Sequence, residues 1–321
     1  MRKALQLLAL LADGQKHAGA DLATSLGGSR AAIWNQVQRL REVGIEVEAD
    51  RTHGYRLTHP FEPLSEDALN AEFLSASERR LTATVVPVID STNGSLIEAS
   101  TQRDVHGDVL LAEYQSAGRG RRGDRWQSPP GSGLWFSLGW RFAAPPSTFS
   151  ALGLIVGLSL ARTLRAAGVG GVELKWPNDL VCGGRKLGGI LIEMRAEAGG
   201  PAKVVIGIGI NYRLGATVAE SIDRPVTDLT SEGAGESGRN ALAANLVLRL
   251  SHDLDRFDID GFGPFQVEWP HFDALSNRAV RLELGDRIEA GIVRGVDDYG
   301  ALKLEQGGTI NTYLSGHLLP A

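Results

Sequence analysis

Apolar residues recur at helical spacing over the first sixty residues, interrupted by glycines. Residues 4–12 and 20–26 are predicted helices, and a third begins after Ser29, whose hydroxyl can cap its N-terminus. The apolar positions of this third helix fall at i, i+4 and i+7 and are Ile33, Val37 and Leu40. Two glycines alone separate the second helix from the third. A link this tight is typical of a helix-turn-helix.

The apolar pattern changes to a period of two after the third helix. Apolar residues alternate with acidic ones over 45–49, a turn is expected at 51–54, and 55–57 returns as a second strand. A β-hairpin in this position predicts a wing beside the helix-turn-helix. Pro60 and Pro63 mark the end of the unit.

Strand-like and helix-like segments mix between about residues 84 and 273. Strands are expected at 109–114, 134–140 and 204–210, and helices at 152–164 and 242–257. Strands often follow one another without the helix that a parallel crossover needs, which argues against a doubly wound sheet. We therefore predict a mixed sheet with helices on one face.

Short alternating strands separated by turn signals follow Asn277, and this spacing predicts a small β-barrel. The predicted fold class is α+β. It has a winged helix-turn-helix over residues 1–62, a central mixed-sheet domain with helices packed on it over 63–272, and a barrel over 273–321.

The cysteine content and the apolar segments indicate where in the cell the protein is expected. Cys182 is the single cysteine, so an internal disulfide and a cysteine-based structural metal site are excluded, and a cytoplasmic location is expected. Arg2 and Lys3 precede an apolar run as in a secretory signal, but the run is short and contains Gln6. No segment reaches the roughly 20 apolar residues of a membrane span, so no membrane association is expected.

Charge is distributed unevenly along the chain. Residues 1–59 hold 8 Lys or Arg against 6 Asp or Glu, a local charge of +2. The net charge of the whole chain is −5, so the remaining residues carry −7. Only the first segment is compatible with nucleic acid.

A glycine-arginine run follows the strand at 109–114. The run Gly118-Arg119-Gly120-Arg121-Arg122-Gly123 has the glycine spacing of a dinucleotide-binding turn. Such a turn must open a helix, whereas paired prolines follow here. We interpret the run as a loop whose glycines let the backbone approach a ligand while its arginines neutralise phosphate or carboxylate charge. A solvated basic turn is the alternative.

Three further polar clusters interrupt apolar strands. They are Asp90 to Asn93, Lys175 to Asp179 with Arg185 to Glu193, and Gly207 to Asn211. Glycine inside a strand suggests a ligand lying against the sheet. An Asx turn at Asn178 and a helix cap at Ser91 are the alternatives.

These four clusters, in this order, resemble the biotin protein ligase family over nearly the whole chain. The N-terminal and C-terminal units resemble those of its bifunctional members, which also repress the biotin operon. The resemblance implies that biotin and Mg·ATP form biotinyl-5'-AMP, and that biotin passes to a lysine of a biotin carboxyl carrier protein. It also implies an SH3-like barrel, and an adenylate-bound homodimer on operator DNA.

The resemblance also implies which individual residues bind biotin and ATP. The biotin-binding set is Ser91, Thr92, Asn93, Gln115, Gly118, Arg119, Gly120, Arg121, Lys186 and Gly188. The ATP-binding set is Arg121, Arg122, Trp126, Asn178, Lys186 and Asn211. No residue is assigned to a metal, since magnesium arrives with ATP.

Three residues are expected to carry the chemistry. Lys186 and Arg121 would stabilise the charge that develops on the α-phosphate, and Asp179 would orient or deprotonate the acceptor lysine. A structural turn carboxylate is the alternative for Asp179. The segment 212–235 corresponds to the one that orders over the adenylate. Asp124 departs from the family, which commonly has a basic residue there.

Four residues of the third helix are expected to face DNA: Ser29, Arg30, Ala31 and Gln38. Three competing functions stay open. They are a ligase whose N-terminal domain does not repress, a lipoate-type protein ligase, and a transcription factor with a degenerate ligand-sensing domain.

Overall fold

The computed structural model describes residues 1–50, 52–59, 61–76, 81–143, 146–195, 202–234 and 238–320. Three residues used in the sequence predictions lie outside these ranges. They are Arg51 in the wing turn, Pro60 at the boundary, and Gly235 at the end of the segment expected to order over the adenylate.

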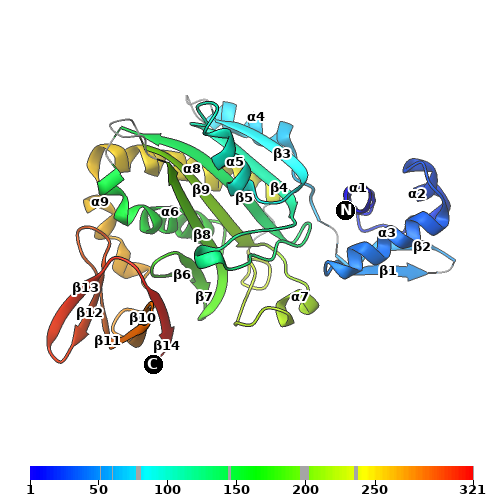
Figure 1. The fold of residues 1–321 in the computed structure, drawn as a ribbon. Helices are drawn as coiled ribbons and strands as arrows, with labels where there is room; N and C mark the ends of the chain where they lie inside the picture. Colours follow the sequence, from blue (N-terminus) through cyan, green and yellow to red (C-terminus); the bar gives the residue numbers. More distant parts are fainter. Residues whose placement is uncertain are drawn as a thin grey trace.

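The predicted winged helix-turn-helix is confirmed (Figure 1). Its elements are α1 (Arg2–Leu10), α2 (Gly19–Ser25), α3 (Arg30–Glu42), β1 (Val47–Asp50) and β2 (Gly54–Leu57). Ser29 caps α3, because its hydroxyl accepts a hydrogen bond from the Ala32 N–H at 3.2 Å. Ile33, Val37 and Leu40 are buried against α1, as their spacing predicts.

A seven-stranded mixed sheet forms the centre of the molecule (Figure 1). Its strands are β3 (Thr82–Ile89), β4 (Asp108–Gln115), β5 (Gly133–Phe142), β6 (Val172–Lys175), β7 (Asp179–Cys182), β8 (Arg185–Arg195) and β9 (Ala202–Asn211). The order is β3-β4-β5-β9-β8-β7-β6, in which β3 and β4 are parallel and every other neighbouring pair is antiparallel. The prediction of a mixed sheet is confirmed.

Helices cover both faces of this sheet, so the prediction that they lie on one face is wrong. On one face lie α4 (Glu66–Ala76), α6 (Leu152–Ala166) and α8 (Arg239–Asp260). α5 (Thr92–Ala99) packs on the other face, where Leu96 meets Val205. Successive residues of β9 point to opposite faces, so Val204 and Ile206 join the main core while Val205 packs under α5.

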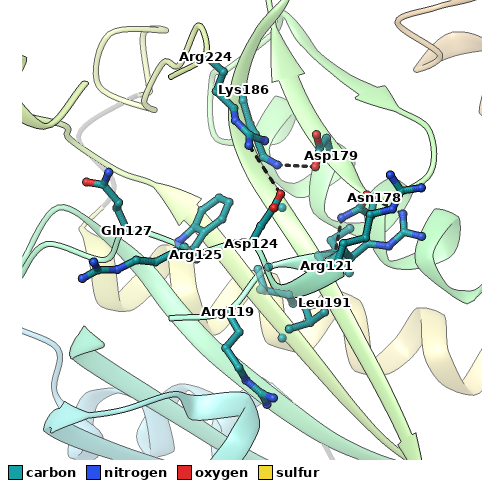
Figure 2. Close-up of a pocket in the computed structure, with 18 of the residues that line it drawn as sticks. Arg119, Arg121, Asp124, Arg125, Gln127, Asn178, Asp179, Lys186, Leu191 and Arg224 are labelled. Carbon is teal, nitrogen blue, oxygen red and sulfur yellow. Dashed lines mark hydrogen bonds and ion pairs between the residues drawn. The ribbon is translucent and has the colours of Figure 1, made fainter. Parts of the chain in front are cut away.

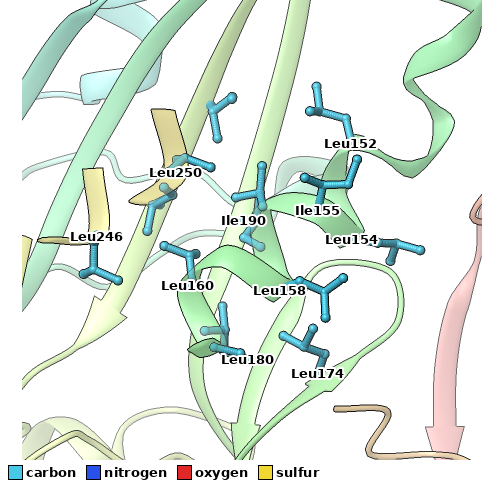
Figure 3. Close-up of a cluster of buried hydrophobic side chains, with 14 of the residues drawn as sticks. Leu152, Leu154, Ile155, Leu158, Leu160, Leu174, Leu180, Ile190, Leu246 and Leu250 are labelled. Carbon is cyan, nitrogen blue, oxygen red and sulfur yellow. The ribbon is translucent and has the colours of Figure 1, made fainter. Parts of the chain in front are cut away.

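Helix α6 is the apolar centre of the main core. Leu158 and Leu160 of this helix are fully buried among residues of the sheet and of α8 (Figure 3). Phe149–Ala166 is long and apolar enough to cross a membrane by length and composition, but 67% of it is buried inside the protein. Packing within the core accounts for this hydrophobicity.

The C-terminal unit is a five-stranded antiparallel sheet in the order β13-β12-β11-β10-β14. Its strands are β10 (Ala279–Leu284), β11 (Arg287–Val296), β12 (Leu302–Gln306), β13 (Thr309–Tyr313) and β14 (His317–Pro320). Within the described residues no pairing joins β13 to β14, so the closed barrel stays a prediction. The shorter helices are α7 (Ala216–Glu220) and α9 (Gly263–Gln266), and the 3₁₀ turns span Arg121–Gly123, Pro146–Ala151 and Trp269–His271.

Both outer units contact the central one. The Trp176 indole N–H donates to the Gly300 carbonyl of the C-terminal unit at 3.1 Å. At Gly44, after α3, φ is +87° and a Cβ would lie 2.2 Å from Cγ2 of Val218 in α7. Only glycine allows this approach between the winged helix-turn-helix and the segment that follows β9.

Candidate active site

A cavity of about 330 Å³ lies where the four polar clusters meet, between the central sheet and the loops after β4 and β9 (Figure 2). The predicted site residues that line it are Ser91, Thr92, Asn93, Gln115, Arg119, Gly120, Arg121, Arg122, Trp126, Asn178, Asp179, Lys186 and Asn211. Gly118 and Gly188 are not among its lining residues. A Cβ there would lie 2.5 Å from the Trp126 carbonyl and 2.8 Å from the Gly209 carbonyl, so backbone packing explains these two glycines.

One end of the cavity is a network of neutral polar groups. The Gln115 side-chain oxygen accepts from the Thr92 N–H at 2.9 Å and from its hydroxyl at 3.2 Å. The Gln115 amide donates to the Ser128 hydroxyl at 3.0 Å, and the Ser137 and Thr92 hydroxyl oxygens lie 2.8 Å apart. A pre-arranged set of uncharged donors and acceptors suits a neutral polar ligand such as a urea.

Residues beside this network are held by an acidic residue that the sequence predictions did not single out. Glu193 Oε2 accepts from the Asn93 amide at 2.6 Å and from Arg119 Nη2 at 2.8 Å. Ser137, with no exposed surface, also donates to Asn93 Oδ1 at 2.8 Å. A serine within the apolar strand β5 was the signal available for Ser137, and Glu193 had none beyond its place after the glycines of β8.

The other end of the cavity is cationic. Lys186 Nζ lies 2.7 Å from Asp179 Oδ1, and Arg121 Nη1 donates to Asn178 Oδ1 at 3.1 Å (Figure 2). Burial, and then the neighbouring Arg122, lower the pKa of Arg121 from its ordinary value. Fixed cations in a partly desolvated site stabilise a phosphate or carboxylate.

The glycines inside β8 and β9 make room for side chains of this chain. A Cβ at Gly209 would lie 2.6 Å from the Trp126 indole, and a Cβ at Gly207 would lie 2.4 Å from Asn93 Oδ1. Gly207 and Gly209 nevertheless line the cavity, so the interpretation that a ligand lies against the sheet at these glycines stays a prediction. Trp126 is packed edge-on against Trp135, with ring centroids 6.1 Å apart, and also lines the cavity.

The segment after β9 runs beside the cavity and is tied to Lys186. The Lys186 N–H donates to the Pro225 carbonyl at 2.9 Å, and the buried Asn211 amide donates to the Thr227 carbonyl at 2.9 Å. Asp124, the departure from the family pattern, faces the same segment, with its Oδ2 3.7 Å from Arg224 Nη2 (Figure 2). This ion pair joins the segment after β9 to the arginine loop, as we call the Gly118–Gly123 run with Asp124.

Two further residues line the cationic end and were given no role in the sequence analysis, although Lys175 begins one of its polar clusters. Lys175 lines the cavity, and burial lowers its pKa, with Asp179 opposing that shift and Lys186 adding to it. His317 comes from β14 of the C-terminal unit. Partial desolvation, and then the charge of Lys175, lower the pKa of His317. No local pattern marks His317, because only tertiary packing brings β14 to the cavity.

Comparison with known proteins identifies the family of this chain. Residues 85–211 match the Biotin/lipoate A/B protein ligase family, residues 3–56 match an HTH domain, and residues 275–317 match the Biotin protein ligase C terminal domain. The chain is 40% identical over 314 residues to the Bifunctional ligase/repressor BirA of Escherichia coli (strain K12), covering 98% of this chain and 96% of that protein. The chain belongs to the bifunctional biotin protein ligases.

Other biotin protein ligases match over the catalytic core. The Biotin--[acetyl-CoA-carboxylase] ligase of Mycobacterium tuberculosis (strain ATCC 25618 / H37Rv) is 32% identical over 263 residues, covering 77% of this chain and 91% of that one. The biotin protein ligase from Aquifex aeolicus in complex with biotin and ATP superposes with a TM-score of 0.63 at 27% identity, over 74% of this chain and 97% of that chain. The family resemblance expected from the four clusters is confirmed.

Within the described ranges of this biotin protein ligase, no group of three or more His, Cys, Asp or Glu side chains is placed to hold a metal ion.

Proposed function

We propose that the chain activates biotin with Mg·ATP to biotinyl-5'-AMP, transfers biotin to a lysine of a biotin carboxyl carrier protein in the cytoplasm, and represses biotin biosynthesis genes as an adenylate-bound dimer. The observation that carries the ligase part is that one cavity joins a neutral hydrogen-bonding end at Thr92 and Gln115 to a cationic end at Arg121 and Lys186. Biotin has a neutral ureido ring at one end and a carboxylate at the other.

In the first step, a biotin carboxylate oxygen forms a bond to the α-phosphorus of ATP, and the bond to pyrophosphate breaks. Negative charge concentrates at the α-phosphate. Lys186 and Arg121 stabilise that charge, since they are already oriented before the reaction and are partly shielded from water. Magnesium enters with ATP, and Lys175 and Arg122 line the same end of the cavity.

In the second step, the acceptor lysine attacks the acyl carbon and AMP leaves. An ordinary lysine has a pKa of about 10.4, so deprotonating it at pH 7 costs roughly 4.6 kcal/mol. Asp179 is bound to Lys186 in the free protein. When the adenylate phosphate takes over Lys186, Asp179 becomes available to orient and deprotonate the incoming ammonium group.

The ligase function is tested by incubating the full chain with biotin, Mg·ATP and a biotin acceptor domain. Pyrophosphate release and a mass gain of one biotinyl group on a single acceptor lysine are expected. Lipoate replaces biotin in a parallel reaction, and faster acceptor labelling with lipoate would identify a lipoate-type ligase. Absence of pyrophosphate release with either acid would leave only the transcription-factor alternative.

The repressor function rests on the winged helix-turn-helix and its match to an HTH domain. The local charge of +2 is too small for one copy to hold DNA firmly, so two copies are needed. Sedimentation and gel-shift with DNA upstream of the chain's own biotin biosynthesis genes, with and without biotin and ATP, test this. A chain that stays monomeric and leaves that DNA unshifted when loaded with adenylate is a ligase only.

The functions divide among three domains, at 1–62, 63–272 and 273–321. The matched ranges 3–56 and 275–317 fall inside the first and the last of these. Ser29, Arg30, Ala31 and Gln38 are proposed to face DNA.

A further inference from the structure

The recognition helix carries one large apolar side chain on its exposed side. Trp34 is 55% exposed, whereas Ile33 and Val37 beside it are buried. Helical spacing places Trp34 on the same stripe as Arg30, Ala31 and Gln38, which stand four residues before, three residues before and four residues after it. A tryptophan at the centre of such a stripe presents a large apolar surface to any molecule that this helix binds.

The charge around Trp34 indicates the class of that molecule. Residues 22–41 contain Arg30, Arg39 and Arg41 and no Asp or Glu, a local charge of +3. In the part of the chain that the structure describes, neither Arg30 nor Arg39 makes a side-chain hydrogen bond or ion pair. Unpaired cations on the third helix of a winged helix-turn-helix are complementary to the phosphates of DNA, and this favours DNA as the molecule that Trp34 meets.

The base that an indole would recognise follows from groove chemistry. Among the four bases, only thymine presents an apolar group, its C5-methyl, in the major groove. Arginine pairs with guanine and glutamine with adenine by bidentate hydrogen bonds, so Arg30 and Gln38 suit polar base edges on either side of Trp34. Resting on the proposed repressor function, we infer that Trp34 is a specificity-determining residue that packs on a thymine methyl in each half-site of the operator.

The experiment begins with a duplex selected from random-sequence DNA by the full chain in the presence of biotin and Mg·ATP. Each thymine of the selected duplex is then replaced by deoxyuridine, which deletes only the methyl group. The wild-type chain should lose about fourfold in affinity at one position per half-site, or about sixteenfold when both half-sites are changed, as expected for one buried methyl each. Trp34→Ala should bind the thymine duplex at least about sixteenfold more weakly than wild type, because both methyl contacts are lost, and should not distinguish it from the deoxyuridine duplex.

Two further variants keep the result interpretable. Gln38→Ala should bind more weakly but keep the full loss on methyl deletion, because it removes a different base contact. Trp34→Leu should keep part of the loss, since it keeps an apolar surface. Circular dichroism on each variant checks that the N-terminal domain is folded. A wild-type chain indifferent to every deoxyuridine, or a Trp34→Ala chain that keeps the loss, overturns the inference while leaving DNA binding intact. A chain that enriches no sequence overturns the repressor function itself.

Discussion

Lys186 and Asp179 form an ion pair of 2.7 Å inside the cavity, between the neighbouring strands β8 and β7. Both side chains are mostly shielded, with exposed fractions of 16% and 20%. The two residues with the clearest proposed roles in the two steps are therefore partners in the free protein. A ligand phosphate that binds Lys186 would compete with Asp179 for that ammonium group, and the Asp179 carboxylate would then be available to another partner.

Lys186→Ala should slow adenylate formation at least about tenfold, because it removes a cation facing the developing charge. Biotin binding should persist, since the neutral network at Thr92 and Gln115 is untouched. Single-turnover release of pyrophosphate, with biotin binding measured separately by calorimetry, gives both quantities. The matched control is Lys203→Ala, a lysine that does not line the cavity. An unchanged single-turnover rate would remove Lys186 from the proposed mechanism.

Asp179→Asn should affect the two steps unequally. Adenylate formation should fall less than about threefold, while transfer to the acceptor lysine at pH 7 should fall about a hundredfold, the range of general-base catalysis. Raising the pH toward 9 should recover part of the transfer rate in the variant, because more of the lysine is then already neutral. A quench-flow assay that starts from preformed adenylate isolates the second step. Equal losses in both steps would indicate a structural carboxylate.

Arg121→Gly should let biotinyl-5'-AMP escape. Arg121 links the arginine loop to Asn178 at 3.1 Å, so its loss removes both a cation and the loop's tie to the sheet. The escaped ester should then label lysines of an unrelated bystander protein, detected on a streptavidin blot. Arg249→Ala, which changes an arginine outside the cavity, serves as the control. Labelling confined to the proper acceptor would contradict retention by this loop.

Asp124 and Arg224 should act as a weak electrostatic tie between the two loops. The pair is exposed and 3.7 Å apart, so its contribution is small, about 0.5 kcal/mol. Asp124→Lys should speed adenylate release about threefold through like-charge repulsion, and the swapped double variant with Arg224→Asp should restore the wild-type rate. Stopped-flow release measured at low and high salt checks this, since salt should erase the difference. If the swap fails to restore the rate, the two residues do not interact in solution.

Cys182 should be unreactive in the native protein. It is 4% exposed, and burial, together with the nearby carboxylate of Glu232, raises the thiol pKa to about 11. At pH 8 its thiolate fraction, and so its alkylation by iodoacetamide, should be about a hundredfold below that of the unfolded chain. Mass spectrometry of native and urea-unfolded samples measures both.

The same shift predicts a pH dependence of stability. Between pH 9 and about 11 the folded chain keeps the thiol proton that the unfolded chain loses, so the free energy of unfolding should fall as the pH rises through that window. Cys182→Ala should lose this component of the slope. A wild-type slope equal to that of Cys182→Ala would show that the thiol pKa is ordinary.

Local sequence patterns were sufficient to predict those elements whose structure depends on residues close together in the chain. The hydroxyl of Ser29 and the spacing of Ile33, Val37 and Leu40 determine α3, because capping and helical periodicity act within a few residues. The resemblance to biotin protein ligases assigned 15 residues to one site, and 13 of them line one cavity. Trp34 lay in the same helix but was not assigned, because its importance depends on exposure.

Only the tertiary structure decided which groups meet. Asn93 and Trp126 pack over Gly207 and Gly209, a contact that the strand pattern alone did not indicate. Ser137 and Glu193 complete the network from β5 and β8, and His317 enters the cavity from the far end of the chain. The sequence by itself determined the helices, most strands, the family and the chemistry of the cavity. Contacts between residues tens to hundreds of positions apart depend on strand order and domain packing, which no local periodicity encodes.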